Sequence, residues 1–449
     1  MSTTRLAVTG LLLMPYAAMA ADYEFRTRFE FEAAQNVAEG YAQKMEFQAR
    51  PELHVFPDAD SEITAIARLR ADAEDRLEVG RPLQEEVSEY SRRAIIGSHG
   101  DAELRELYYK HRFGQSYLTV GKQQVVWGTA DGLRVLDVVN PFSFREFLLE
   151  DFDEARIPLW MVNYIHSIGS DTDLQLLVIP DLTFNDFPDG DGDDAPEYEI
   201  TSPRFQPGFP ADVPPNLAGV TNLGLQRPSD SLQNADAGLR LSTRLGELDL
   251  TFNYLYQYDD NPVPYRRINT ASGQPVLEFW QEYERTHLLG STLSTDLSST
   301  LVLRYEIGLV RGRRVLRENL NNDNGVLNTD ELSYVLGLDW SGVSDTLFSV
   351  QLFQSVLKDD APDLVRDRVD STMTFNVNSR FFNDTLTLEF MALHNLNDHD
   401  DLIRPSVTYA VRDGVNLWLG ADIFTGEEAG VFGQFGETDR VLAGVEWYW

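Results

Sequence analysis

The sequence predicts an all-β protein, a transmembrane antiparallel β-barrel of about eighteen strands with short periplasmic turns and long external loops. Three observations predict this fold class. Apolar and polar residues alternate in many segments, the connections between these segments are alternately short and long, and the chain ends in a strand rich in aromatic residues. We therefore expect the chain to cross the cell outer membrane with strands.

The first twenty residues have the pattern of a secretory signal peptide. Arg5 precedes a short apolar stretch, residues 6–16, and Ala18-Met19-Ala20 forms an A-x-A cleavage site. The apolar stretch is too short to cross a bilayer as a helix. We expect residues 1–20 to be removed and residues 21–449 to form a single barrel domain.

Alternation with a period of two indicates strands that have one apolar face and one polar face. At the start of the mature chain, aromatic residues share one parity and charged residues the other: Tyr23, Phe25, Phe29 and Phe31 against Arg26, Arg28, Glu30 and Glu32. The same pattern recurs at residues 248–257, 301–307 and 369–378. Such segments are roughly ten residues long, as a tilted membrane-spanning strand requires.

The connections between these segments distinguish a membrane barrel from other all-β folds. Short connections such as residues 113–116 and 412–414 alternate with long ones such as residues 73–102, 123–157 and 181–235. A secreted sandwich or solenoid also has alternating strands, but its loops need not follow this rhythm. With both termini in the periplasm, the short turns face the periplasm, the long loops face outward and the strand number is even.

The C-terminal residues support the same interpretation. Val441, Ala443, Val445, Trp447 and Trp449 lie on one face of the last segment. This ending resembles the C-terminal signal of outer-membrane proteins, although Trp449 stands where that signal usually has Phe. Aromatic residues at strand ends also suit a membrane–water interface. We expect outer-membrane lipids to surround the barrel.

The formal net charge of −35 and the absence of cysteine exclude several classes of protein. Binding of nucleic acid needs clustered Lys and Arg, so we expect no nucleic acid partner. No disulfide or thiolate site can form. None of the seven histidines lies in an H-E-x-x-H motif and no serine lies in G-x-S-x-G, so we expect neither enzymatic activity nor a cofactor. The acidic clusters at 146–154, 189–194 and 394–401 match no standard metal site, and we interpret them as solvated.

One long connection, residues 122–157, carries signs of internal order. Gly128 and Asp131-Gly132 predict turns, and Asn140-Pro141 ends a segment. The run Ser143-Phe144-Arg145-Glu146 reads as a capping box that opens a short helix, with Phe144, Phe147, Leu148 and Phe152 in one apolar stripe. We expect this loop to fold into the lumen and constrict it; a self-packed external cap is the alternative.

The residues of this loop also resemble a known family. The stretch 119–162 is similar to an uncharacterised Gram-negative outer-membrane barrel family, a domain of unknown function with the number thirteen hundred and two. The matching motif, which we treat as the constriction-loop motif, comprises Gly121, Gln123, Trp127, Gly128, Asp131, Asp137, Asn140, Pro141, Arg156 and Pro158. Phe142-Ser143 replaces the family's usual Val-Asp after Asn-Pro, and the acidic run 150–154 replaces its Pro-Gly-Ala-Glu element. The resemblance implies an outer-membrane protein often encoded near inner-membrane exporters of hydrophobic molecules.

Within the motif, residue chemistry suggests separate roles. We expect Trp127 to anchor the loop by burying its ring and Asn140-Pro141 to fix where the chain turns back. Asp131 and Asp137 are expected to hold turns through side-chain bonds to nearby amides.

Charged residues on the polar parity are candidates for the lumen wall. They are Arg26, Arg28, Glu30, Arg240, Arg244, Arg304, Glu306, Arg380 and Glu389. Such side chains either pair with one another in a filled lumen or create a transverse field in a channel.

These observations favour an outer-membrane channel or transport barrel. Its cargo is expected to be a small hydrophobic or lipid-like molecule, handled together with an inner-membrane exporter or a periplasmic carrier protein. A general diffusion porin for small polar solutes is the alternative, and a surface receptor or adhesin without a transport role is the second alternative. The oligomeric state is left open.

Overall fold

The computed structural model describes residues 21–80, 84–188, 195–205, 217–271, 273–320 and 324–449. The expected signal peptide, residues 1–20, and the acidic run at 189–194 lie outside the described residues.

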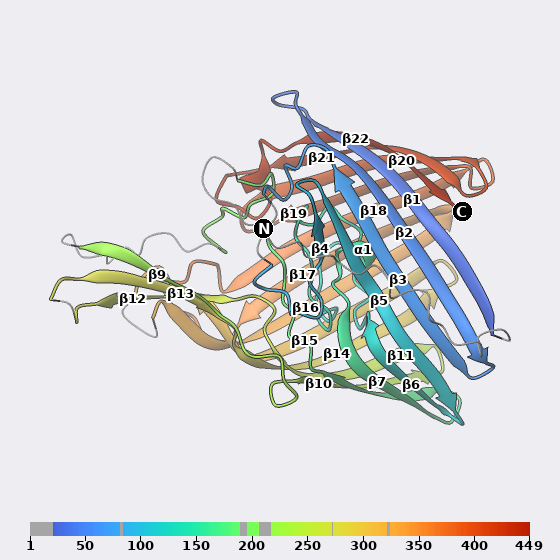
Figure 1. Ribbon diagram of the computed structural model, residues 1–449, viewed down its shortest axis with the longest axis horizontal. Coiled ribbons are helices and arrows are strands. Elements are labelled where there is room, and N and C mark those ends of the chain that lie inside the picture. Colours follow the sequence, from blue (N-terminus) through green and yellow to red (C-terminus); the bar gives the residue numbers. More distant parts are fainter. Residues whose placement is uncertain (1–20, 81–83, 189–194, 206–216, 272, 321–323) are drawn as a thin grey trace, which may run out of the picture.

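The described residues form one closed antiparallel barrel of 18 strands (Figure 1). The strands are β1 (Asp22–Asn36), β2 (Ala42–Asp58), β3 (Ser61–Asp72), β5 (Gly100–Phe113), β6 (Ser116–Gln123), β7 (Leu159–Ile168), β8 (Thr172–Ile179), β10 (Asp236–Leu245), β11 (Leu248–Tyr258), β14 (Arg285–Ser298), β15 (Leu301–Leu316), β16 (Val326–Val343), β17 (Thr346–Leu357), β18 (Val369–Phe381), β19 (Leu386–Asn395), β20 (Asp400–Arg412), β21 (Val415–Thr425) and β22 (Arg440–Tyr448). The first and last strands close the barrel, with Arg28 opposite Tyr448 and Asn36 opposite Arg440. The predicted fold class is confirmed.

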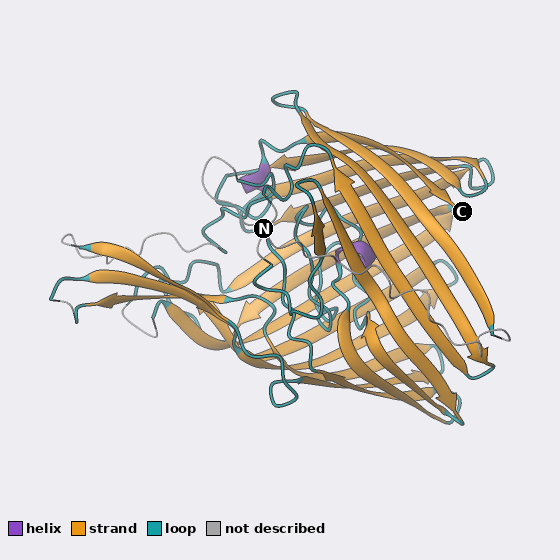
Figure 2. Cartoon of the chain, viewed as in Figure 1, coloured by secondary structure: helices purple, strands orange, loops and turns teal. Residues whose placement is uncertain are grey.

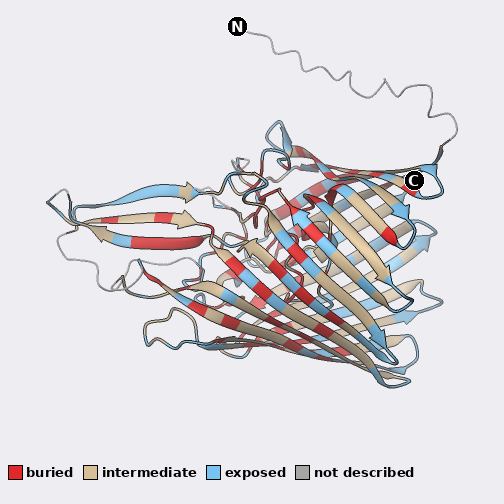
Figure 3. Ribbon diagram, turned by 90° about the horizontal axis from the view of Figure 1, so that it is seen from below, coloured by how far each residue is buried: buried red, intermediate tan, exposed pale blue. Residues whose placement is uncertain are grey.

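The two faces of the strands differ as the alternation predicted. Large apolar side chains such as Phe25, Leu107 and Phe252 are exposed on the outer face, where membrane lipid would cover them. Polar side chains of the opposite parity, such as Gln351 and Thr374, are buried inside. Buried residues gather toward the end of the barrel that carries the long connections, whereas the ends at the short turns are exposed (Figure 3).

Several strands extend beyond the membrane-spanning length. The alternation of the sequence predicts a long connection at residues 312–330, but the observed connection is shorter, because β15 continues to Leu316 and β16 begins at Val326. Their ladder continues past a bulge between Arg311 and Arg313. The alternation of short and long connections still holds around the barrel (Figure 2).

The long connections contain the remaining elements. A short strand, β4 (Ala94–Ile96), pairs with β5, and a separate sheet contains β9 (Gly219–Gln226), β12 (Val263–Asn269) and β13 (Val276–Glu282). Figure 1 shows this small sheet projecting from one end of the barrel. The helical elements among the described residues are α1 (Phe152–Ala155) and the 3₁₀ turn η3 (Gly433–Phe435). Within the described ranges, no helix has the length and apolar character needed to cross a bilayer.

The helix predicted from the capping box at residues 143–146 is wrong. Residues 145–148 form a turn, and Phe147 adopts a left-handed backbone with φ of 54°. The expected apolar stripe is divided among different partners: Phe144 stacks on Phe187, and Phe147 packs against Phe435. Only one helical turn, α1, forms, and it begins where the stripe was expected to end.

Candidate functional site

The connection between β6 and β7 lies inside the barrel; we call residues 124–158 the inserted segment. Trp127 donates from Nε1 to Oε1 of Gln175 on β8 at 3.0 Å. Gln351 on β17 donates from Nε2 to Asp131 at 2.7 Å. Because β8 and β17 are far apart around the wall, the inserted segment crosses the lumen between them.

One side of the inserted segment packs on an apolar part of the inner wall. Trp127, Val135, Leu136 and Val139 are buried against wall residues from β7 to β17. The wall residues of this cluster are Leu159, Met161, Leu177, Ile179, Leu255, Leu288, Val335 and Phe353. Burial of this many apolar side chains favours the inserted position over a solvated loop.

Two glycines in the wall make room for Leu136 and Trp127 of the inserted segment. A Cβ atom at Gly290 would lie 2.4 Å from Cδ2 of Leu136, and one at Gly238 would lie 3.0 Å from Cη2 of Trp127. A distance of 2.4 Å does not occur between real side chains, so alanine at Gly290 would displace Leu136, whereas alanine at Gly238 would require the Trp127 ring to shift slightly. The inner wall is therefore shaped to this segment.

Polar wall side chains hold the backbone of the same region. Both oxygens of Glu306 accept hydrogen bonds from the segment: one from Thr129, through its amide and its hydroxyl at 2.9 Å, and the other from the amide of Leu136 at 3.3 Å. Arg304 pairs with Asp131 at 2.5 Å and with Asp339 of β16. Asp131 therefore binds wall side chains, and the expectation that it bonds nearby amides is wrong.

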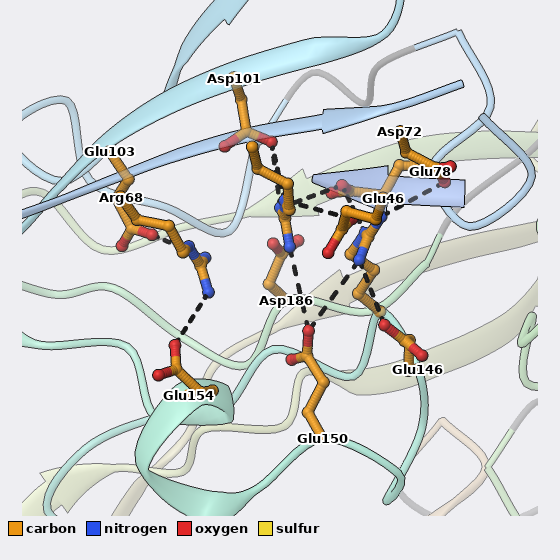
Figure 4. Close-up of polar contacts among 12 residues, drawn as sticks. Glu46, Arg68, Asp72, Glu78, Asp101, Glu103, Glu146, Glu150, Glu154 and Asp186 are labelled. Atoms are coloured by element: carbon orange, nitrogen blue, oxygen red, sulfur yellow. Dashed lines mark hydrogen bonds and ion pairs between the residues drawn. The ribbon is translucent and has the colours of Figure 1, made fainter. Parts of the chain in front are cut away.

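The other side of the inserted segment enters a buried network of ion pairs (Figure 4). Arg145 pairs with Glu46 of β2 at 2.6 Å and with Glu78 at 2.9 Å. Glu146 pairs with Lys44 at 2.6 Å and with Arg440 of β22 at 2.7 Å. The interpretation of the 146–154 cluster as a solvated acidic face is therefore wrong for Glu146, which is 2% exposed.

Surrounding cations keep Glu146 ionised in this network. Burial alone would raise the pKa of its carboxyl, but Lys44, Arg440 and Arg145 together hold that pKa well below its ordinary value. Glu150 behaves differently, because burial and the neighbouring Glu146 raise its pKa. A buried charge that has lost its partner is costly, so the network holds the inserted segment against the wall.

Glu154 of α1 extends the network toward the middle of β1–β3. Its carboxylate pairs with Arg28 at 2.9 Å, with Arg50 and with Arg68 at 3.8 Å. Burial opposes ionisation, but Arg50, Arg105, Arg28 and Arg68 lower the pKa of Glu154 to about 2. Asp186 lies at the edge of the network 3.5 Å from Arg93, and burial raises its pKa to about 6.

Three motif residues close the neck of the inserted segment. The side chain of Asn140 accepts a hydrogen bond from the amide of Val125 at 2.8 Å and donates to the carbonyl of Ile157 at 2.9 Å. Arg156 pairs with Asp137 at 2.7 Å. Asn140 thus joins the two ends of the segment, and Asp137 binds a side chain where a bond to a nearby amide was expected.

The remaining motif residues lie in and beside this neck. Gly121 has φ of 136°, and a Cβ there would lie 2.1 Å from the carbonyl oxygen of Leu107. Gly128 packs against Asp137, where a Cβ would lie 2.8 Å from the backbone nitrogen. Gln123 accepts a hydrogen bond from Asn163 at 3.3 Å. Pro141 and Pro158 are buried beside them.

The candidate lumen charges divide into two groups. Arg28, Arg240, Arg304 and Glu306 contact the inserted segment, Arg240 through the carbonyl of Val126. The others contact wall residues: Arg26 pairs with Glu52, Glu30 with Arg28, and Arg244 with Asp249, and Glu389 accepts a hydrogen bond from Asn378. Arg380 is exposed, and its backbone amide donates to the backbone carbonyl of Asp345. Four of these nine residues thus hold the segment directly.

Sequence reasoning missed most of the cations in the buried network. These are Lys44, Arg50, Arg68, Arg70, Arg105, Arg404 and Arg440, from β2, β3, β5, β20 and β22. Their polar parity in the strands was a usable signal. Their partners were not predictable, because Glu146 and Arg440 are 294 positions apart.

An aromatic cluster lies where the external connections meet the inserted segment. Phe147 packs against Phe432 and Phe435, with ring centroids 6.2 and 4.6 Å apart, and Tyr198 packs against Phe435 and Phe424. These residues come from the inserted segment, from the β8–β10 connection and from the end of β21 with its following loop. The cluster therefore fixes two external connections onto the inserted segment.

A cavity of about 430 Å³ remains between the inserted segment and the wall strands β11 and β14–β18. Apolar side chains of the segment line one side: Leu133, Val135, Val138, Phe144, Leu148 and Phe152. Among the described residues, no group of His, Asp or Glu side chains has the arrangement of a metal site. The cavity can thus hold a small organic molecule.

Solved structures show the same fold. The chain is similar to OccK1 (OpdK) of Pseudomonas aeruginosa at 10% identity, with 95% of this chain and 98% of that chain covered and a TM-score of 0.51. It is similar to OccK8 (OprE) of the same organism at 11% identity, with coverages of 96% and 98% and a TM-score of 0.52. For OccAB1 of Acinetobacter baumannii the identity is 9%, both coverages are 96% and the TM-score is 0.52.

No curated protein matches the sequence. A family profile described as "Protein of unknown function (DUF1302)" matches residues 97–317. This region contains the whole inserted segment and the wall strands from β5 to β15 that contact its apolar side. This match includes residues 119–162, so the resemblance seen over that stretch is confirmed.

Proposed function

We propose that this protein is an outer-membrane channel in which the inserted segment narrows the lumen, and that it passes a small molecule with a large apolar part. The observation that carries the proposal is the two-sided fixation of the inserted segment. Ion pairs hold it to β1–β3 and β22, and apolar packing holds it to β7–β17. Such a segment leaves a selective path and no wide aqueous pore.

The lining of the remaining space supports an apolar cargo. The cavity beside the segment presents leucine, valine and phenylalanine side chains from both the segment and the wall. A second apolar groove lies on the outer face of β3, β5, β6 and β7, lined by Ile63, Leu107, Tyr109, Val120 and Val162. Both surfaces suit a molecule that partitions between water and lipid.

The two alternatives make different predictions for solute entry. A general diffusion porin admits solutes mainly by size, so glucose enters faster than its larger phenyl glycoside. A surface receptor or adhesin admits neither. A channel with an apolar path favours phenyl glucoside over glucose, although phenyl glucoside is the larger molecule.

Swelling of proteoliposomes in isotonic glucose or phenyl glucoside tests these predictions. Vesicles without protein correct for leakage of each solute through the lipid. Faster swelling in phenyl glucoside supports the proposal, whereas faster swelling in glucose contradicts it in favour of a porin. Swelling equal to that of protein-free vesicles in both solutes contradicts a channel function.

We further propose that an inner-membrane exporter or a periplasmic carrier protein delivers the cargo at the short turns. The support is the family resemblance together with the narrow lumen, which suits directed transfer. The chain has no cysteine, so a single cysteine at Gly246 in a short turn gives a specific crosslinking site. We expect the cysteine at position 246 to form a crosslink to an exporter or carrier. A cysteine at Gly273, in the turn between β12 and β13, should form none. The lack of a crosslink from position 246 contradicts the proposal.

A further inference from the structure

The cavity beside the inserted segment contains charged groups among its apolar side chains. Its lining includes four arginines, Arg134, Arg204, Arg313 and Arg366, and three aspartates, Asp259, Asp260 and Asp370. Charged groups that face such a space are normally satisfied by partners of opposite charge. Whether each one has such a partner therefore shows what the cavity can bind.

Three of the four arginines are neutralised within the protein. Arg313 pairs with Glu331 at 2.6 Å and also with Asp259. Arg366 pairs with the same glutamate at 3.1 Å. Arg204 pairs with both Asp370 and Asp398. These guanidinium groups are consequently occupied.

Arg134 is the exception. Its Nη1 donates to the carbonyl of Asp137 at 3.3 Å, and its guanidinium lies 3.6 Å from the ring centroid of Phe142. Across the described ranges, no carboxylate oxygen lies within 4.0 Å of this guanidinium. Burial lowers the pKa of Arg134 to about 10, so the group still carries its charge at neutral pH.

The two acidic groups that act on Arg134, Asp260 and Asp137, do not form an ion pair with it among the described residues, and Asp137 already pairs with Arg156. Asp260 attracts Arg134 across the cavity, but the two are too far apart to form an ion pair. Burial and the neighbouring Asp259 hold the pKa of Asp260 well above its ordinary value. The burial that raises this pKa disfavours negative charge on Asp260, which weakens its attraction for Arg134.

We propose that this cavity binds an amphipathic monocarboxylate, whose carboxylate pairs with Arg134 and whose apolar body packs on Val138, Phe144 and Phe152. The planar guanidinium matches a carboxylate through two parallel hydrogen bonds. A single unneutralised cation, with Asp259 and Asp370 nearby, suits one negative charge and disfavours a multiply charged anion. The inference deepens the proposed channel function by naming its substrate class, and it rests on that function.

Calorimetric titration of the purified protein with 4-phenylbutyrate and with 4-phenylbutanamide tests the inference. The two probes share their apolar body and differ only in charge, so partition into detergent affects both in a similar way. The variants are Arg134→Gln, which removes the cation, and Arg134→Lys, which keeps the charge without the planar fork. Arg244→Gln is the matched control, because Arg244 is 65% exposed and pairs with Asp249 beside a short turn.

The unaltered protein is expected to bind the carboxylate about tenfold more tightly than the amide, in line with one charge-assisted contact. Arg134→Gln should remove this preference, Arg134→Lys should keep part of it and Arg244→Gln should keep all of it. A preference that persists in Arg134→Gln overturns the inference, as does equal affinity of the unaltered protein for both probes or a lack of binding. The swelling assay with neutral glycosides does not depend on Arg134 charge, so failure of the channel proposal is recognised separately.

Discussion

Nη1 of Arg440 on the last strand lies 2.7 Å from Oε2 of Glu146 in the inserted segment, and both side chains are 2% exposed. Arg440 also pairs with Asp422 of β21 at 2.7 Å, and β22 is the strand that closes the barrel against β1. One guanidinium thus links the closing strand, its neighbour and the segment in the lumen. Seating of the segment and stability of the barrel are therefore coupled at this residue.

Replacing Glu146 with Ala should loosen the inserted segment and destabilise the folded barrel. The change leaves Lys44 and Arg440 buried with one partner fewer, and breaking such a pair costs about 3–5 kcal/mol. The temperature at which the folded band converts on a gel should fall, and single-channel conductance should rise. Asp249→Asn is the control: it breaks the exposed pair with Arg244, which should change stability very little because water screens both charges. Equal effects of the two changes would contradict this account.

Deletion of residues 140–152 should enlarge single-channel conductance while the barrel still shows heat-modifiable migration. The strands hold the fold through their own ladder, whereas the segment supplies the obstruction. Trp127→Ala should act in the same direction but more weakly, because it removes one apolar anchor and leaves the ion pairs in place. Recordings in planar bilayers measure both effects. Conductances equal to that of the unaltered protein would show that the segment does not limit the path.

Gly290→Ala should displace Leu136 and loosen the same segment. The new Cβ would lie 2.4 Å from Cδ2 of Leu136, and overpacking of this kind costs about 1–3 kcal/mol. The double variant Gly290→Ala/Leu136→Ala should be more stable than Leu136→Ala alone. The methyl group added at position 290 fills part of the space that the leucine side chain left. Gly219→Ala serves as control, because a Cβ there meets nothing within 4 Å. If the shift in thermal midpoint of the double variant equals the sum of the two single shifts, residue 290 and Leu136 do not contact each other.

The barrel was predictable because its signals are local. Alternation places Phe25 and Arg26 on opposite faces whatever the rest of the chain does, and short connections leave antiparallel pairing as the simplest arrangement. The helix predicted from residue 143 does not form, because ion pairs with distant residues outweigh the local capping pattern. Arg145 and Glu146 are drawn to Glu46, Glu78, Lys44 and Arg440 in the network, and Phe147 takes a left-handed conformation between them and the aromatic cluster.

The site was predictable only in part for the same reason. Trp127 and Asn140 stand out in the sequence because of their residue types and their place in an interrupted strand pattern. Arg134 does not stand out, since its significance lies in the lack of a carboxylate partner among the described residues and in the cavity it faces. Both properties depend on side chains from β11, β15 and β17, which no local pattern connects to it.

The orientation of the barrel predicts which connections can be labelled from outside intact cells. A cysteine at Gly273, between β12 and β13, should react with a membrane-impermeant maleimide. A cysteine at Gly246, between β10 and β11, should react only after the outer membrane is permeabilised, because short turns face the periplasm. The chain has no cysteine of its own, so background labelling is low. Reversed labelling of the two sites would mean that the barrel is inserted the other way.

Two carboxyl groups in the buried network should respond to pH with opposite signs. Burial raises the pKa of Asp186 from 3.8 to about 6, so its native state binds a proton more tightly than the unfolded chain does. Its contribution to stability is therefore fully present below pH 3.8 and is lost as the pH rises through about 6. For Glu154 the cations lower the pKa from 4.5 to about 2, so its contribution is present above pH 4.5 and is lost as the pH falls through about 2.

Asp186→Asn should consequently raise the thermal midpoint at pH 8, where the unaltered carboxyl is buried in its charged form, and should have little effect near the ordinary pKa of 3.8. Glu154→Gln should lower the midpoint at pH 8 and still lower it at pH 5, because it removes a charge that Arg28 and Arg50 hold. Each effect is on the order of 1–3 kcal/mol. Heat-modifiability curves recorded at the three pH values measure both variants. Destabilisation by Asp186→Asn at pH 8 would show that the pair with Arg93 outweighs the burial of Asp186, which would contradict the direction predicted here.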